Sequence, residues 1–103
     1  IAKEWLFTGR VVDVKEAQAA GLFNRVVATD EVLATAMELA QQIAVNAPIG
    51  VCGVKKVADN YTLPADEAFA LEMELYGQVI NTEDRLEGIL AFNEKRQPKF
   101  VGR

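Results

Sequence analysis

The stretch LEMELYGQVINTEDRLEGILAFNEKRQPKFVGR, residues 71–103, decides the fold class of this chain. It predicts an amphipathic helix, a capped turn, a second amphipathic helix and a tail that Pro98 separates from that helix. The last nine residues carry four positive charges and no carboxylate side chain: Lys95, Arg96, Lys99 and Arg103. We therefore expect a helical hairpin that presents an anion-binding tail, as a lid or docking element would. It does not look like a self-contained active site.

Apolar spacing and capping residues predict helices over most of the remaining chain as well. The expected helices cover residues 1–7, 14–20, 32–45, 48–59 and 64–81. The segment Leu22–Ala28 is expected to form the one short strand, because it contains adjacent β-branched residues. The helix over 64–81 carries two apolar stripes, so we expect one of them to be covered by another subunit or domain.

Several residues are expected to begin or end these helices. Asp13 and Asp30 are candidate N-caps, and Gly9 and Gly21 are expected to end helices in the left-handed conformation. Either Asn81 or Thr82 is expected to cap the last helix. The first helix opens without an N-cap and without methionine, as the interior of a longer chain or a trimmed start would.

The composition excludes several classes of function within this chain. It has no histidine and no serine, so a Ser-His or Cys-His nucleophile pair cannot form, and one cysteine cannot build a zinc site. Twelve of the fifteen carboxylates lie in residues 30–94, which argues against nucleic-acid binding. No apolar run approaches the ~20 residues that span a bilayer, so we expect no membrane partner. The single Cys52 fits a reducing compartment, and we expect a cytoplasmic protein.

Acid–base chemistry in this chain could fall only to Asp, Glu, Lys or Tyr. Its carboxylates lie on the polar sides of predicted helices, and we expect these sides to be solvated. Cations are common at helix C-termini, so the basic tail has an ordinary structural interpretation. Four charges beside Phe100 could also hold a phosphorylated adenosine, with the ring as an apolar platform.

Four segments together are similar to a known family: LFTGR (6–10), GLFNRVV (21–27), APIGVCGVKK (47–56) and TEDRLEGILAFNEKRQPKF (82–100). They resemble the C-terminal part of the enoyl-CoA hydratase/isomerase (crotonase) superfamily. The resemblance covers essentially the whole chain, and the closing segment is its most specific piece. The hydratase branch matches best, although this end of the family does not separate hydratases from isomerases.

The resemblance implies a mostly α fold, the C-terminal helical trimerisation and lid region of a crotonase-type α/β spiral, with one short strand. Residues 1–29 would form the end of the spiral core (helix, turn, short helix, strand), and residues 30–103 the C-terminal helical region. In the family, two backbone N–H groups hold the thioester enolate, and two hydratase glutamates handle water and the proton. The resemblance places these groups upstream, so we expect this chain to be inactive alone.

The resemblance also implies roles for particular residues. Lys95, in the EKR motif, would reach the CoA phosphates, and Tyr76, where phenylalanine is usual, would line the CoA pocket. In the family such residues commonly serve a neighbouring subunit's active site. Leu22, Phe23 and Val26 are expected at a subunit or core interface.

The implied substrate is an acyl-CoA of fatty-acid metabolism, so CoA enters as part of the substrate and no separate cofactor or metal is expected. The implied partners are the N-terminal spiral core and further copies of the chain in a trimer or hexamer. Asp13-Val14 and Phe23 depart from the small residues and the valine usual in the family, which puts close packing around residues 13–23 in doubt.

Two alternatives remain open on the residues alone. The chain could be a stand-alone helical interaction module without enzymatic activity, with the tail as a partner-binding arm. It could also be a degenerate family member that binds CoA without catalysis. A stable folded monomer of the 103 residues would favour the interaction module. A titration with CoA would test for the family member that binds CoA without catalysis.

Overall fold

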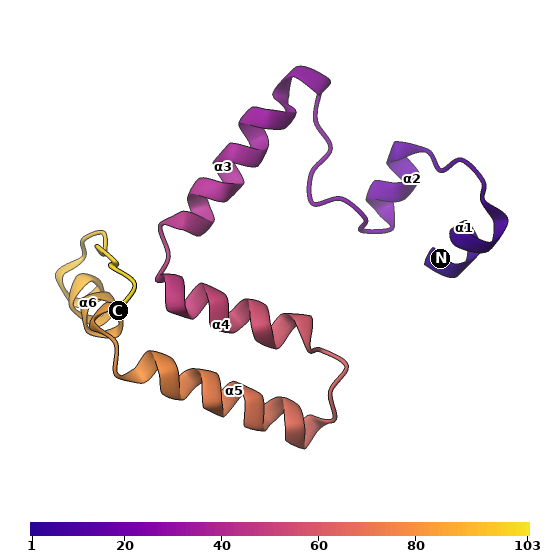
Figure 1. Cartoon of the computed structure of the whole chain (residues 1–103). Helices are drawn as coiled ribbons and strands as arrows, with labels where there is room; N and C mark the ends of the chain where they lie inside the picture. Colours follow the sequence, from indigo (N-terminus) through magenta and orange to yellow (C-terminus); the bar gives the residue numbers. More distant parts are fainter. The chain divides into compact units, whose positions relative to one another are not determined.

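The structure, a computed structural model, describes all residues 1–103 and contains helices joined by irregular segments (Figure 1). In order, the elements are α1 (Ala2–Thr8), α2 (Val14–Ala19), the 3-10 turn η1 (Thr29–Glu31), α3 (Val32–Ala44), α4 (Pro48–Asp59), α5 (Ala65–Ile80) and α6 (Glu83–Glu94). The chain forms two compact units, residues 1–37 and 38–103. The division at residues 29 and 30 that the family resemblance implies stays a prediction.

The strand predicted for Leu22–Ala28 is wrong, because the structure has no strand and these residues are irregular. A strand persists when its backbone N–H and C=O groups pair with a neighbouring strand. No second strand exists in this chain, so the β-branched residues supply a propensity without a partner. The fold is therefore all-α.

In the first unit, the ends of α1 and α2 follow the predicted chemistry. Gly9 ends α1 with φ 60°, and its N–H donates to the Trp5 carbonyl at 3.0 Å. Asp13 caps α2 by accepting from the Lys15 N–H at 2.8 Å, and Gly21 follows with φ 78°. The expected capping role of Asp30 is wrong, because Asp30 lies inside η1, which has no side-chain cap.

The second unit is built on an antiparallel pair formed by α4 and α5, with α6 packed on the end of α5 (Figure 1). Pro48 occupies the first position of α4, as predicted. The inner stripe of α5 faces α4, where Leu75 is buried and an added Cβ on Gly53 would lie 3.8 Å from the Leu75 Cβ. The outer stripe, with Phe69, remains exposed. One stripe is thus covered within the chain, and the covering of the other by a further subunit or domain stays a prediction.

The chain buries little apolar surface of its own. Its buried apolar residues are Ala17, Leu75 and Ala91. Large apolar side chains are exposed on every helix from α1 to α6. Each such side chain gains about 1.5–3 kcal/mol when it is buried, so these faces call for a covering surface. None of the helices has the length and apolar character that crossing a membrane requires.

Candidate functional site

The basic tail is not a free arm. Residues 96–103, which we call the C-terminal strap, turn back along α6 and are bound there by its carboxylates. The Lys99 N–H donates to Glu87 Oε1 at 2.6 Å. The N–H groups of Val101 and Gly102 donate to the two oxygens of Asp84 at 2.6 and 2.8 Å. The backbone of the strap is therefore fixed at three successive points by two side chains of one helix.

The prediction of a solvated acidic face on α6 holds for Glu83 and Glu94, which are exposed, but is wrong for Asp84, which is buried. Asp84 is only 2% exposed, and its own N–H donates to the Arg103 carbonyl at 3.2 Å. Thr82 begins the helix, as predicted, because its Oγ1 accepts from the Arg85 N–H at 3.1 Å. Helical periodicity places Asp84 correctly on the polar side of α6 but does not reveal that the strap covers that side.

An ion-pair clamp joins the start of the strap to α6. The Arg96 guanidinium donates to both oxygens of Glu87, at 2.6 and 2.9 Å, and its Nε donates to Glu94 at 2.6 Å. These contacts lower the pKa of Glu87 to about 2, because Arg96 and then the Lys99 N–H stabilise the charged carboxylate. The same carboxylates raise the pKa of Arg96 above its ordinary value.

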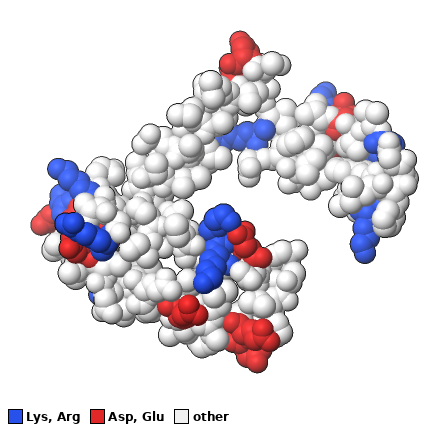
Figure 2. Space-filling model, viewed as in Figure 1, with Lys and Arg blue, Asp and Glu red and all other residues white.

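The strap has fewer available charges than its sequence suggests. Arg96 is neutralised by the clamp, and Arg103 pairs with Glu83 at 3.2 Å. Figure 2 shows the resulting mixture of basic and acidic atoms over this end of the chain. Lys95 and Lys99 form no ion pair. The ammonium groups of Lys95, at the end of α6, and of Lys99, in the strap, are therefore those that remain for an external anion.

Lys95 ends α6 in an unusual backbone conformation. It has φ 55° and ψ 39°, and it is the only non-glycine residue of the chain with a positive φ. Its N–H donates to the Phe92 carbonyl at 3.3 Å, and the Arg96 N–H donates to the Ala91 carbonyl at 3.0 Å. This pair of bonds is the Schellman ending of a helix, whose left-handed position usually holds glycine.

Tyr76 lies on α5 and is 52% exposed. It lines an apolar groove of about 450 Å³ between α4 and α5, together with Val54, Leu75 and Val79. Lys95 does not line this groove. Lys95 and Tyr76 therefore do not share this groove.

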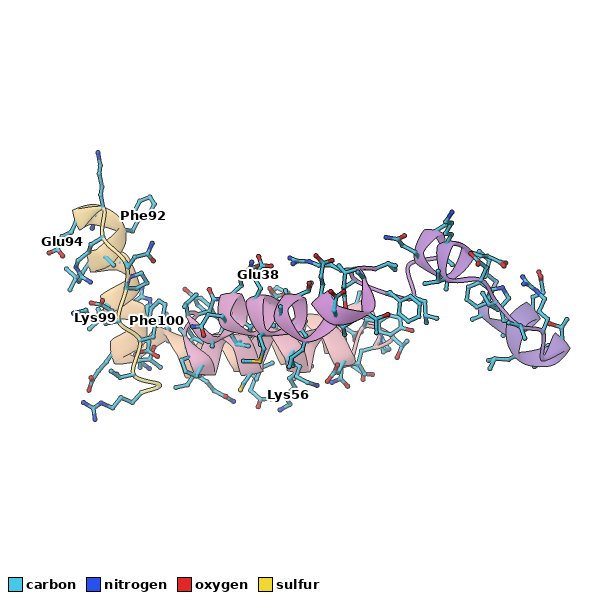
Figure 3. The ribbon with its side chains drawn as sticks, turned by 90° about the horizontal axis from the view of Figure 1, so that it is seen from above. Glu38, Lys56, Phe92, Glu94, Lys99 and Phe100 are labelled. Carbon is cyan, nitrogen blue, oxygen red and sulfur yellow. The ribbon has the colours of Figure 1, made fainter.

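The two aromatic residues near the strap differ in availability. Phe100, the expected platform, is half-buried over α6, where its ring would lie 3.6 Å from a Cβ added to Gly88 (Figure 3). Phe92 is 84% exposed and stands three residues before Lys95 on α6.

The remaining predicted contact residues belong to the first unit. Leu22, Phe23 and Val26 lie in the irregular segment between α2 and η1, and all three are exposed. Their role at an interface stays a prediction. No group of three or more Cys, Asp or Glu side chains is arranged to hold a metal ion.

The fold and this site define an all-α region with exposed apolar faces, in which Lys95 takes no part in the ion pairs between α6 and the strap. Residues 1–103 match the family model described as "Enoyl-CoA hydratase/isomerase". The chain therefore belongs to the enoyl-CoA hydratase/isomerase family, as the sequence resemblance predicted.

Curated relatives and solved structures agree with this assignment. The chain is 45% identical to the mouse "Enoyl-CoA hydratase domain-containing protein 2, mitochondrial", covering 100% of this chain and 36% of that protein. It is 41% identical to "Carnitinyl-CoA dehydratase" of Proteus mirabilis, and the match covers 100% of this chain and 41% of that protein. The crystal structure of an enoyl-CoA hydratase from Bacillus anthracis is 39% identical, with a TM-score of 0.94 over 99% of this chain and 40% of that one.

The chain spans about two fifths or less of the length of these relatives. This share agrees with a match to one part of the family fold, which the resemblance identifies as the C-terminal part.

Proposed function

We propose that the chain is the C-terminal helical part of an enzyme that adds water to a CoA thioester, an enoyl-CoA hydratase of fatty-acid metabolism. The observation that carries this proposal is the family match over the full length of the chain. The names of several relatives support the reaction class, since they include enoyl-CoA hydratase, carnitinyl-CoA dehydratase and methylglutaconyl-CoA hydratase. The single cysteine supports a reducing compartment, and we propose the cytoplasm.

One role of this part is assembly. The outer stripe of α5, with Phe69 and Met73, is exposed, and so are Leu22, Phe23 and Val26. We propose that the N-terminal spiral core and neighbouring subunits of a trimer or hexamer cover these faces. A stand-alone interaction module is less well supported, because so few apolar residues are buried within the chain.

The other role is to hold the CoA part of the substrate. Lys95 is free of ion pairs, and its ammonium group would meet a CoA phosphate as a compact point charge. Tyr76 would form an apolar wall of a CoA pocket. Lys95 does not line the groove that holds Tyr76, and this agrees with the two residues serving a site completed by a neighbouring subunit. The glutamates and the backbone N–H groups that perform the hydration would lie outside this chain.

Lys95→Ala in the whole protein that contains this chain tests the proposal. We expect the KM for crotonyl-CoA to rise about fivefold, the effect of a contact worth about 1 kcal/mol, with a smaller change in kcat. Lys56→Ala is the matched control, because Lys56 is an exposed lysine of α4 (Figure 3). An unchanged KM for the Lys95 variant would remove this residue from the binding site.

A further inference from the structure

The left-handed backbone of Lys95 requires an explanation. Side chains other than glycine and asparagine rarely adopt this conformation, because the Cβ approaches the following carbonyl group. Such a conformation persists only where the surrounding structure determines it. The other positive-φ residues of this chain are all glycines: Gly9, Gly21 and Gly102.

Besides the Schellman bonds, side-chain contacts next to Lys95 converge on one carboxylate. Glu87 accepts two hydrogen bonds from the Arg96 guanidinium and a third from the Lys99 N–H at 2.6 Å. Arg96 directly follows Lys95, and Pro98 restricts the backbone between the two anchored residues. Glu87 therefore fixes the chain immediately after Lys95, while the Schellman bonds from the Lys95 and Arg96 N–H groups tie these two residues to α6.

We propose that the Glu87–Arg96 ion pair is a positioning device that holds Lys95 in its left-handed conformation and so aims its ammonium group beyond the end of α6, toward the phosphates of CoA. This inference rests on the proposed function, in which Lys95 contacts a CoA phosphate. In this proposal Glu87 and Arg96 are positioning residues, which act through Lys95 and bind each other.

The sign of the expected effect separates positioning from simple electrostatics. Removing the Glu87 charge takes a carboxylate away from the neighbourhood of a bound phosphate, so Coulomb's law alone predicts tighter binding. Loss of positioning predicts weaker binding. Glu83→Gln makes the same change of charge on the same helix and removes only the exposed pair with Arg103.

The experiment measures KM in the whole protein for crotonyl-CoA and for crotonyl-pantetheine, which lacks the nucleotide and its phosphates. We expect Glu87→Gln to raise the KM for the CoA thioester three- to fivefold and to leave that for the pantetheine thioester unchanged. Arg96→Lys keeps the positive charge but loses the two-pronged geometry, and it should act in the same direction. Glu83→Gln should not raise either KM.

The double variant Glu87→Gln/Lys95→Ala completes the test. We expect its KM for crotonyl-CoA to match that of Lys95→Ala alone, because Glu87 acts only through the lysine. A normal or lowered KM in both Glu87→Gln and Arg96→Lys, with a raised KM in Lys95→Ala, would overturn the positioning inference and leave the proposed function standing. An equal rise for both thioesters would show a general structural role and would also overturn it. A normal KM for crotonyl-CoA in Lys95→Ala would instead defeat the proposed phosphate contact itself.

Discussion

Replacing Lys95 with glycine should relieve the backbone strain at the end of α6. The left-handed conformation, φ 55° and ψ 39°, costs a residue with a Cβ about 1–2 kcal/mol. Glycine avoids this cost but loses about 0.5–1 kcal/mol through its greater freedom in the unfolded chain. Any variant also loses the favourable interaction of the lysine charge with the helix dipole. The informative comparison is therefore with Lys95→Ala, which loses the same charge and keeps the strain.

We expect Lys95→Gly to be more stable than Lys95→Ala by about 0.5–1 kcal/mol, the difference between the two backbone terms above. Urea unfolding of the whole protein, at one protein concentration for both variants, measures this difference. Both variants should show the same raised KM for crotonyl-CoA, since both lack the ammonium group. If the alanine variant is as stable as the glycine variant, the strap does not hold position 95 in the left-handed region, and the argument for positioning fails with it.

Three further predictions concern the clamp, the strap and the chain as a whole. The pKa of Glu87 is lowered to about 2 from 4.5, so its ion pair with Arg96 stabilises the folded state fully above pH 4.5, and this stabilisation is lost as the pH falls toward 2. An NMR titration of the Glu87 carboxyl group should show this low midpoint, and Arg96→Gln should raise it. A wild-type midpoint near 4.5 would contradict the ion pair. Asp84→Ala removes a buried acceptor of two backbone N–H groups, so it should destabilise the protein by about 2–3 kcal/mol and accelerate amide exchange at Val101 and Gly102. The control Glu83→Ala removes an exposed ion pair and should change stability by less than about 1 kcal/mol. Equal effects of the two variants on stability would refute the assigned role of Asp84. The isolated 103-residue chain should show no hydration of crotonyl-CoA above background, and measured turnover would overturn the placement of the catalytic groups elsewhere.

The helices of this chain could be predicted from local sequence because their signals are local. Pro48 at the start of α4, Thr82 at the start of α6 and the glycines after α1 and α2 act within one turn of chain, so their chemistry can be interpreted residue by residue. The strand over 22–28 failed for the opposite reason. Strand formation depends on a partner that local propensity cannot supply.

The candidate site could be predicted only in part, because some of its contacts join residues that are far apart in the sequence. The family resemblance implies that Lys95 and Tyr76 contact CoA, and this stays a prediction; the structure shows that both residues are exposed. The sequence cannot show that the strap folds back, because Asp84 meets Val101 seventeen residues later in the chain. A turn of that length leaves no period in the sequence, and so a buried acceptor such as Asp84 looks like an ordinary surface carboxylate.

The folded strap changes what its positive charges can do. Four cations within nine residues repel one another when the tail is extended. In the structure, the two arginines are neutralised by carboxylates of α6, while the two lysines are left without ion pairs. Arginine suits the fixed, two-pronged pairs that shape the backbone, and lysine suits contact with an anion as a mobile point charge. The division of the four residues between these tasks follows their chemistry, and it explains why exchanging Arg96 for lysine should weaken anion binding even though the net charge is preserved.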